Sequence, residues 1–361
     1  MIRNHRRSLI GVAVAITVAL FASSCGEGVN LNASGKSGSG GPGDKVVLVT
    51  YDSFALPEEA AKQFEKETGA RLEVLAGGDS STVLTRALLS AGAPEGDVIF
   101  GIDNTIATRA LSVDLLEEYS PRALNEVDPR FVLSGEAGRK LVPIDHGDVC
   151  LNFDRTYFAE KRIPEPTTLE QLADPLYRNL TVLESPVTSS PGLAFLIGTV
   201  AKFGESGWKS YWEKLKANGV KVRQSWDDAY YTDYTASGGD RPIVLSYASS
   251  PPVEVVYGEG KRSEPASKVM VESCASQVEY AGVLKGAKNP VLARKLLDFM
   301  LSADWQKSLP LSNFVYPVKD VELPEVFKKW SPVVSDPLSL DPAEIDRHRD
   351  EWIEAWRQIM E

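Results

Sequence analysis

Residues 180–200 read LTVLESPVTSSPGLAFLIGTV, and this stretch decides the fold. An extended apolar run, Leu180 to Glu184, leads into the hydroxyl-rich turn Thr188-Ser-Ser-Pro-Gly192 and then into the apolar run Leu193 to Val200. This order predicts a strand, a turn and a helix, with Ser190 as the helix cap. Because such a turn leaves backbone N–H groups free at the positive end of a helix dipole, it predicts half of a site for a polar or anionic group.

A similar unit lies earlier in the chain. The run Leu72 to Leu75 leads through Ala76-Gly-Gly78 and Asp79-Ser-Ser-Thr82 into a helical pattern from Val83 to Ala91. Two such turns can face each other across a cleft. The alternative for each turn is an ordinary capped helix start.

Length and charge limit the classes of protein to consider. A chain of 361 residues with 25% charged and 43% hydrophobic residues is typical of a globular protein of about two domains. The net charge is −11, and it is −14 without the first 25 residues, which include three arginines. Nucleic-acid binding needs a basic face, so this charge argues against a nucleic-acid partner.

The N-terminus has the pattern of an export signal. Basic residues precede an apolar run from Leu9 to Ala22, which is too short for a comfortable membrane span, and Ala22-Ser-Ser-Cys25 resembles a bacterial lipobox. We expect a signal peptide over 1–24, a lipid on Cys25 and a flexible Gly/Ser-rich tether over 25–44. The alternative is a plain cleaved signal with an incidental cysteine.

The two remaining cysteines are Cys150 and Cys274, each in or beside a predicted strand. In an exported, oxidising setting a disulfide between them is the favoured interpretation. The alternative is a reactive thiol.

From Val46 onward the pattern alternates strand and helix, which predicts a mostly parallel α/β sheet covered on both faces. The expected strands are 46–50, 72–75 and 97–101, and the expected helices are 57–68 and 82–90. Ligands of such sheets bind beyond the carboxyl ends of the strands. The residues at those ends are Tyr51, Asp52, Asp79, Ser80, Asp103 and Asn104.

Two extended runs predict crossings between two lobes. The first runs from Leu141 to Phe153 and the second from Gln277 to Gly282. We therefore expect one lobe over 45–147 plus 281–361 and another over 148–280, joined by hinge strands and closing on a ligand. The last helical pattern, 342–360, carries the apolar stripe Ile345, Trp352, Trp356 and Ile359, which we expect to pack against the first lobe.

The chemistry that recurs at the predicted loop tips is that of a binding site. Only three histidines are present and they do not cluster, and there is neither a glycine-rich phosphate loop nor a Gly-x-Ser-x-Gly elbow. Aromatic, hydroxyl and carboxylate side chains recur instead. Aromatic faces hold flat rings and cations, and carboxylates balance a positive ring. We predict no catalytic residue, no metal and no cofactor.

Five motifs together resemble one known family. They are Val49-Thr-Tyr-Asp-Ser-Phe54, Gly101-Ile-Asp-Asn104, Thr188-Ser-Ser-Pro-Gly-Leu193, Leu245-Ser-Tyr-Ala-Ser-Ser-Pro251 and Asn313-Phe-Val-Tyr-Pro-Val318. In this order they resemble the thiamine-binding proteins of bacterial ABC importers. The resemblance implies a type II periplasmic-binding-protein clamshell. It also implies a monomeric, lipid-anchored receptor on the extracytoplasmic face of the membrane that captures thiamine, or its monophosphate or diphosphate, for an ABC permease.

The same resemblance implies a set of ligand-binding residues: Tyr51, Asp52, Asp79, Ser80, Ser189, Ser190, Trp226, Tyr247, Ala248, Ser249, Ser250 and Phe314. The ligand's terminal hydroxyl or phosphate would meet Asp79 and the serines, and its rings would meet Tyr51, Asp52 and Phe314. The chain departs from the family where Ser80 replaces a glycine, Phe314 a tryptophan, Ala248 a threonine and Val253 an aromatic residue.

Two other functions fit parts of the sequence. Tyr230-Tyr231, with Tyr234 nearby, resembles the tandem tyrosines of ferric-iron-binding clamshells, since phenolates are good ligands for hard metals. Thiaminase I is an enzyme of the same fold that uses a cysteine nucleophile, so a free Cys150 or Cys274 near the pocket would favour that activity.

Overall fold

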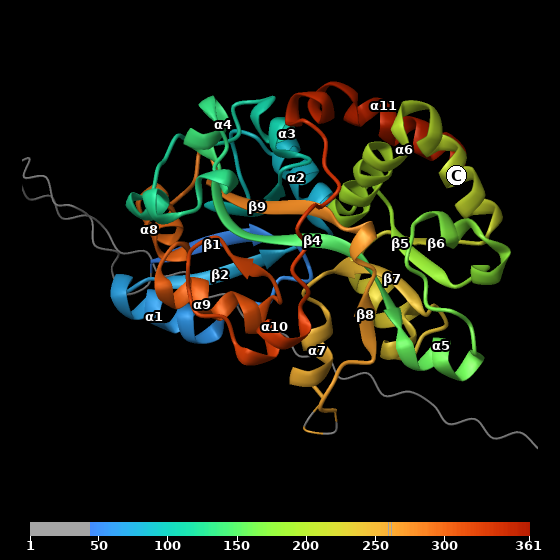
Figure 1. The fold of residues 1–361 in the computed structure, drawn as a ribbon. Helices are drawn as coiled ribbons and strands as arrows, with labels where there is room; N and C mark the ends of the chain where they lie inside the picture. The colour runs from blue at the N-terminus through green and yellow to red at the C-terminus, as the bar shows by residue number, and fades with distance from the viewer. Residues whose placement is uncertain (1–43, 259, 261) are drawn as a thin grey trace, which may run out of the picture. The chain divides into compact units, whose positions relative to one another are not determined.

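The computed structural model describes residues 44–258, 260 and 262–361. The predicted signal peptide, the lipidation site Cys25 and all but the end of the tether lie outside the described residues. Within the described residues one ten-stranded sheet has the order β2-β1-β3-β9-β4-β7-β5-β6, and β8 and β10 pair with β4 (Figure 1). We call β2-β1-β3 with their helices the first lobe, β7-β5-β6 with theirs the second lobe, and β4 and β9 the hinge strands.

The first lobe has the predicted alternation of strand and helix. Strand β1 (Lys45–Thr50) runs parallel to both β2 (Arg71–Ala76) and β3 (Val98–Asp103). Helix α1 (Glu58–Thr68) ends at Gly69, whose φ of 72° is the left-handed conformation that a glycine adopts without strain. The other helices over this part of the chain are α2 (Ser80–Leu89), α3 (Ala107–Leu111), α4 (Gly135–Lys140), η1 (Arg122–Glu126) and η2 (Pro129–Phe131).

The two hinge strands are the predicted crossings. The extended run predicted from residue 141 to 153 is one continuous strand, β4 (Val142–Asp154), and it pairs antiparallel with β9 (Ala275–Val283). Since the chain leaves the first lobe along β4 and returns along β9, the two strands run in opposite directions. The sheet is therefore mixed, and the prediction of a mostly parallel sheet holds only within each lobe.

The second lobe repeats the parallel arrangement. Strand β5 (Thr181–Glu184) runs parallel to β6 (Lys221–Arg223) and β7 (Ile243–Tyr247). Helix α6 (Ser190–Ala217) is interrupted at Gly204, whose φ of 68° and ψ of 171° are not helical. The remaining elements are α5 (Arg155–Lys161), η3 (Glu170–Ala173), η4 (Pro175–Tyr177), η5 (Asp228–Asp233), η6 (Thr235–Ser237), α7 (Pro251–Val256), β8 (Ser267–Val269) and η7 (Val271–Ser273).

The C-terminal part of the chain crosses between the lobes a third time, which the sequence did not predict. After β9 come α8 (Pro290–Met300), α9 (Ala303–Ser312), β10 (Tyr316–Pro317) and α10 (Glu325–Trp330). Leu338 then hydrogen-bonds to the backbone at the start of β9, and helix α11 (Pro342–Met360) follows.

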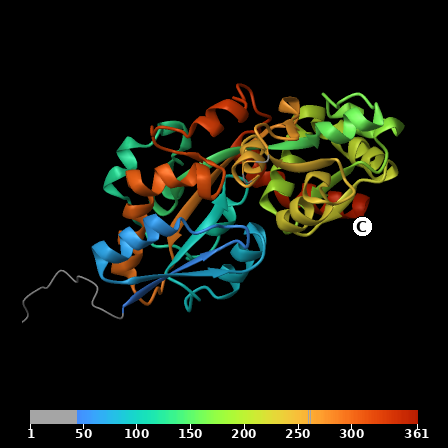
Figure 2. The same ribbon diagram turned by 90° about the horizontal axis from the view of Figure 1, so that it is seen from below.

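Helix α11 packs on α6 of the second lobe, so the expectation that its apolar stripe covers the first lobe is wrong (Figures 1 and 2). The Trp356 ring meets the Trp212 ring edge to face at 5.7 Å, and Trp352 donates to Glu205. Arg349 reaches back to the first lobe, where it donates to the carbonyl of Thr105 and to the hydroxyl of Thr108. Amphipathic periodicity shows that a helix has a partner but does not say which one.

None of the helices in the part of the chain that the structure describes combines the length and the apolarity that a membrane span needs.

Candidate functional site

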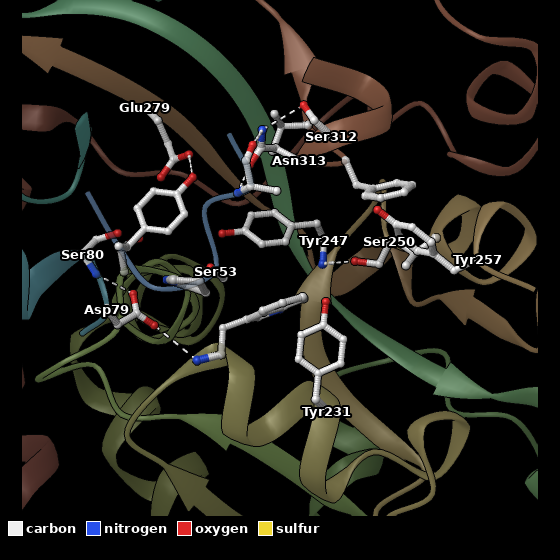
Figure 3. A pocket seen from close by; sticks show the side chains of 18 residues that line it. Ser53, Asp79, Ser80, Tyr231, Tyr247, Ser250, Tyr257, Glu279, Ser312 and Asn313 are labelled. Atoms are coloured by element: carbon white, nitrogen blue, oxygen red, sulfur yellow. Dashed lines mark hydrogen bonds between the residues drawn. The ribbon is translucent and has the colours of Figure 1, made fainter. Parts of the chain in front are cut away.

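One cavity lies where the two lobes meet along the hinge strands (Figure 3). Its space, including the part that is open to solvent, is about 850 Å³. The residues that line it are Tyr51, Ser53, Ala55, Asp79, Ser80, Ser190, Pro191, Trp226, Tyr231, Tyr247, Ser250, Val253, Tyr257, Glu279, Ser312, Asn313, Phe314 and Val315. Among these described residues the charged ones are Asp79 and Glu279, both acidic, and no lysine or arginine contributes.

Asp79 joins the two lobes at the cavity. It is the N-cap of α2, where its Oδ1 accepts from the Ser80 N–H at 2.7 Å, and its Oδ2 accepts from the Trp226 N–H of the second lobe at 3.2 Å. Burial raises the pKa of Asp79 to about 6, although N–H and O–H donors from both lobes oppose the rise. A helix N-terminus favours a negative charge, so this carboxylate is held by both the α2 cap and the facing lobe.

The first turn of α6 forms the adjacent wall. Ser189 is the N-cap of this helix and its side chain makes no capping bond, so the prediction that Ser190 caps the helix is wrong. The Ser190 hydroxyl instead accepts from Gln277 on hinge strand β9 at 2.8 Å. The same Gln277 amide donates to Asp103 at 2.7 Å. The N-terminus of α6 is therefore fixed to the hinge, and its N–H groups are not capped by Ser189.

Trp226 is a fixed aromatic platform. Its ring stacks on Tyr230 with centroids 4.7 Å apart and an interplanar angle of 18°, and its Nε1 donates to the Ser246 hydroxyl at 3.0 Å. Ser246 in turn lies 2.7 Å from the Ser250 hydroxyl. Because Tyr230 covers one side of the indole and Trp226 also lines the cavity, the opposite face is available to a flat ligand.

Further aromatic side chains line the outer part of the cavity. Phe314 and Tyr257 have ring centroids 5.7 Å apart, and Tyr231 meets the Trp226 ring edge to face at 5.4 Å. Tyr231 is 58% exposed and Tyr257 64% exposed, which is high for large aromatic residues. A flat ligand would cover part of this surface.

Phe314 has a backbone conformation that is rare for a non-glycine residue. Its φ is 54°, in the left-handed region, which costs on the order of 1–3 kcal/mol for an ordinary side chain. The neighbouring Asn313 exchanges two hydrogen bonds of 2.9 Å with the backbone of Ala55 and so fixes this segment to the loop after β1. Strain of this kind concentrates at functional sites, and here it directs an aromatic ring to the cavity.

An acidic group lies at the hinge side of the cavity. Glu279 on β9 accepts from the Tyr51 hydroxyl at 2.9 Å, and it is the register partner of Asp145 on β4. Burial raises the pKa of Glu279 to about 7, with the Asp103 carboxyl adding to the rise. Burial and the facing Glu279 likewise raise the pKa of Asp145.

The structure gathers two thirds of the predicted ligand-binding residues at this cavity. Those that line it are Tyr51, Asp79, Ser80, Ser190, Trp226, Tyr247, Ser250 and Phe314. Four others lie nearby without lining it: Asp52 is exposed, Ser189 and Ser249 are completely buried, and Ala248 packs against the two cysteines.

Sequence reasoning did not select ten of the lining residues as ligand contacts: Ser53, Ala55, Pro191, Tyr231, Val253, Tyr257, Glu279, Ser312, Asn313 and Val315. Several of them neighbour motifs that were selected. Glu279 carried no signal, because an acidic residue in a strand shows its role only when the paired strands and the cavity are known.

Cys150 and Cys274 form a disulfide in the structure, with Sγ atoms 2.04 Å apart. Neither cysteine lines the cavity, and both pack behind the Tyr247–Ser250 segment with Ala248 and Val269. A cysteine nucleophile at the cavity, as in the thiaminase alternative, has no support from this arrangement.

The three tyrosines of the iron-binding alternative do not come together at the cavity. Tyr230 is 4% exposed beneath Trp226, Tyr234 is buried and bonded to Ser267, and only Tyr231 lines the cavity. In the described part of the chain no group of three or more histidine, cysteine, aspartate or glutamate side chains is arranged to hold a metal ion.

Comparison with known proteins agrees with this geometry. Residues 96–334 match the family model described as "Bacterial extracellular solute-binding protein". The chain belongs to this family of bacterial extracellular solute-binding proteins. It is 30% identical over 319 residues to the "Thiamine-binding periplasmic protein" of Escherichia coli strain K12, covering 87% of this chain and 93% of that protein.

One solved structure and one more distant relative add to this comparison. The structure titled "Periplasmic thiamin binding protein" has a TM-score of 0.78 and 27% identity, and the match covers 91% of this chain and 100% of that one. The predicted two-lobed α/β fold and the resemblance to thiamine-binding proteins are therefore confirmed. The "Iron uptake protein A2" of Synechocystis sp. strain PCC 6803 is less similar, at 25% identity over 72% of this chain and 76% of that protein.

Proposed function

We propose that this solute-binding protein captures thiamine outside the cytoplasm and delivers it to an ABC permease. The observation that carries the proposal is the lining of the cavity, which combines aromatic faces with two carboxyl groups and, among the described residues, no basic side chain. Thiamine is a cation with two flat aromatic rings, and aromatic faces and carboxylates are the groups that bind such a ligand. The thiamine-binding relative in Escherichia coli supports the same choice.

The phosphate esters of thiamine are the closest competing ligands. The first turn of α6 offers N–H groups that the Ser189 side chain does not cap and that suit a phosphate, whereas Asp79, which accepts from the Ser190 N–H there, disfavours a second anion. The two features act in opposite directions. We therefore propose thiamine as the ligand and treat the monophosphate and the diphosphate as comparison ligands.

Isothermal titration calorimetry with thiamine, thiamine monophosphate and thiamine diphosphate tests the function. We expect heat and a single site with thiamine. No heat with any of the three would overturn the proposal. A visible charge-transfer band on addition of ferric ion, in place of that heat, would favour the iron-binding alternative instead.

We also propose that the mature protein is a monomer tethered by a lipid on Cys25, which lies outside the described residues. A Cys25→Ser variant should then leave the membrane fraction and appear in the soluble extracytoplasmic fraction. Retention of the variant in the membrane would argue against the anchor. The expected lobes were 45–147 plus 281–361 and 148–280, and one change is needed because α11 (Pro342–Met360) packs on the second lobe. We propose that the lobes so revised close on the ligand by bending of β4 and β9.

A further inference from the structure

Three carboxyl groups lie in one row across the middle of the sheet. Glu279 on β9 is the register partner of Asp103 on β3 on one side and of Asp145 on β4 on the other. Residues directly opposite on neighbouring strands point to the same face, and like charges at such positions repel. All three are at most 5% exposed, so water does little to screen them. The row is therefore costly unless protons or cations offset the charge.

The two outer carboxyls of the row, Asp103 and Asp145, differ in the hydrogen bonds that they accept. Asp103 accepts hydrogen bonds from the backbone N–H and the hydroxyl of Thr105, from the Ile106 N–H and from Gln277. These four donors stabilise a carboxylate. Asp145 has one oxygen without a partner among the described residues, and its other close group is Glu279 itself. Asp145 is therefore the group that best retains a proton.

The middle member is the one that faces the cavity. Glu279 lines it, and its Oε2 accepts a hydrogen bond from the Tyr51 hydroxyl at 2.9 Å. The other acid that lines the cavity, Asp79, already accepts from the N–H groups of both lobes. Around Glu279 the titratable groups are Tyr51 after β1, Asp79 at the start of α2, Asp103 on β3, Asp145 on β4 and Tyr247 on β7, and none is basic.

We propose that Glu279 is the counter-ion of the ligand's cationic ring, and that Asp145 keeps the proton that the two carboxyls share. The assignment rests on the proposed capture of thiamine and names the residue that selects for its charge. A cation in the cavity supplies the opposite charge that the row lacks, so the free protein holds the acids partly neutral and the ligand makes Glu279 ionise. Glu279, on hinge strand β9, would then make the protein bind a positively charged ligand more tightly than a neutral one of the same shape.

Binding of thiamine and of 3-deazathiamine, an uncharged analogue of nearly the same shape, tests this assignment by calorimetry on the wild-type protein and on Glu279→Gln. We expect Glu279→Gln to weaken thiamine binding at least tenfold and to change binding of the neutral analogue less than twofold. The matched control is Asp97→Asn, since Asp97 is a buried acid bonded to the backbone of Val47 and Asn289, away from the cavity. It should leave the ratio of the two affinities unchanged.

The outcomes separate the counter-ion from the function. Equal loss for both ligands in Glu279→Gln shows a structural role and overturns the counter-ion assignment while thiamine capture stands. Equal affinity of the wild-type protein for the charged and the neutral ligand also overturns it. No binding of thiamine by the wild-type protein overturns the proposed function together with the counter-ion. If Glu279→Gln does not fold, Glu279→Asp keeps the charge and must retain the preference for thiamine over the neutral analogue.

Discussion

Replacing Trp226 by alanine tests the site most directly, because the indole contributes both to the cavity and to the fold around it. One of its faces is covered by Tyr230 and the indole also lines the cavity. A ligand ring on the free face would bury on the order of 100 Å² of indole, which is worth about 2.5 kcal/mol at roughly 25 cal/mol per Å². We therefore expect Trp226→Ala to weaken thiamine binding about 70-fold.

The same variant should also destabilise the unliganded protein. It removes a stacked ring pair worth about 1 kcal/mol and the Nε1 hydrogen bond to Ser246 worth about 1 kcal/mol. Because the folded part of the chain exceeds 300 residues, the expected decrease in melting temperature is about 3 °C. Trp226→Phe keeps a ring over Tyr230 but loses the hydrogen bond. It should therefore retain most of the affinity for thiamine and lose about half as much stability as Trp226→Ala.

Calorimetry for binding and differential scanning calorimetry for stability measure the two effects separately. Binding of Trp226→Ala with wild-type affinity would refute the placement of a ligand ring on the indole. A melting temperature equal to that of the wild-type protein would refute the structural contribution of the ring.

Three further predictions follow from the structure. The pKa of Asp79 is about 6 in the folded protein against an ordinary 3.8, so its contribution to stability is fully present below about pH 4 and is lost as the pH rises to about 6. The melting temperature of an Asp79→Asn variant should therefore change less with pH between about 4 and 6, and a pH profile equal to that of the wild-type protein would contradict this. The disulfide between Cys150 and Cys274 spans 124 residues, so a double alanine variant should lose about 4–5 kcal/mol in the free energy of unfolding by urea titration, and equal midpoints would exclude a stabilising bond. Tyr257→Ala should weaken thiamine binding about five- to tenfold, whereas Tyr257→Phe and the exposed control Leu89→Ala should not. Wild-type affinity of Tyr257→Ala in calorimetry would show that this ring does not contact the ligand.

The sequence by itself determined the elements and the polar ends of the strands. Alternating apolar runs and helical periods depend on neighbours along the chain. Local rules therefore predicted the strand before Tyr51, the turn before α6, and helix α2 with its start placed at residue 82, two residues after the observed start at Ser80. Loop motifs in order were enough to indicate the family. The long C-terminal helix was predicted with its bounds at 342 and 360.

Only the tertiary structure decided which of these elements meet. The pairing of β4 with β9 brings Asp145 opposite Glu279, although 134 positions separate them in the sequence, and no local pattern carries that register. The stripe of α11 could have packed on either lobe, and the third crossing at Leu338 sets it on α6. Periodicity specifies that a face is buried, whereas strand register and the route of the chain specify what buries it.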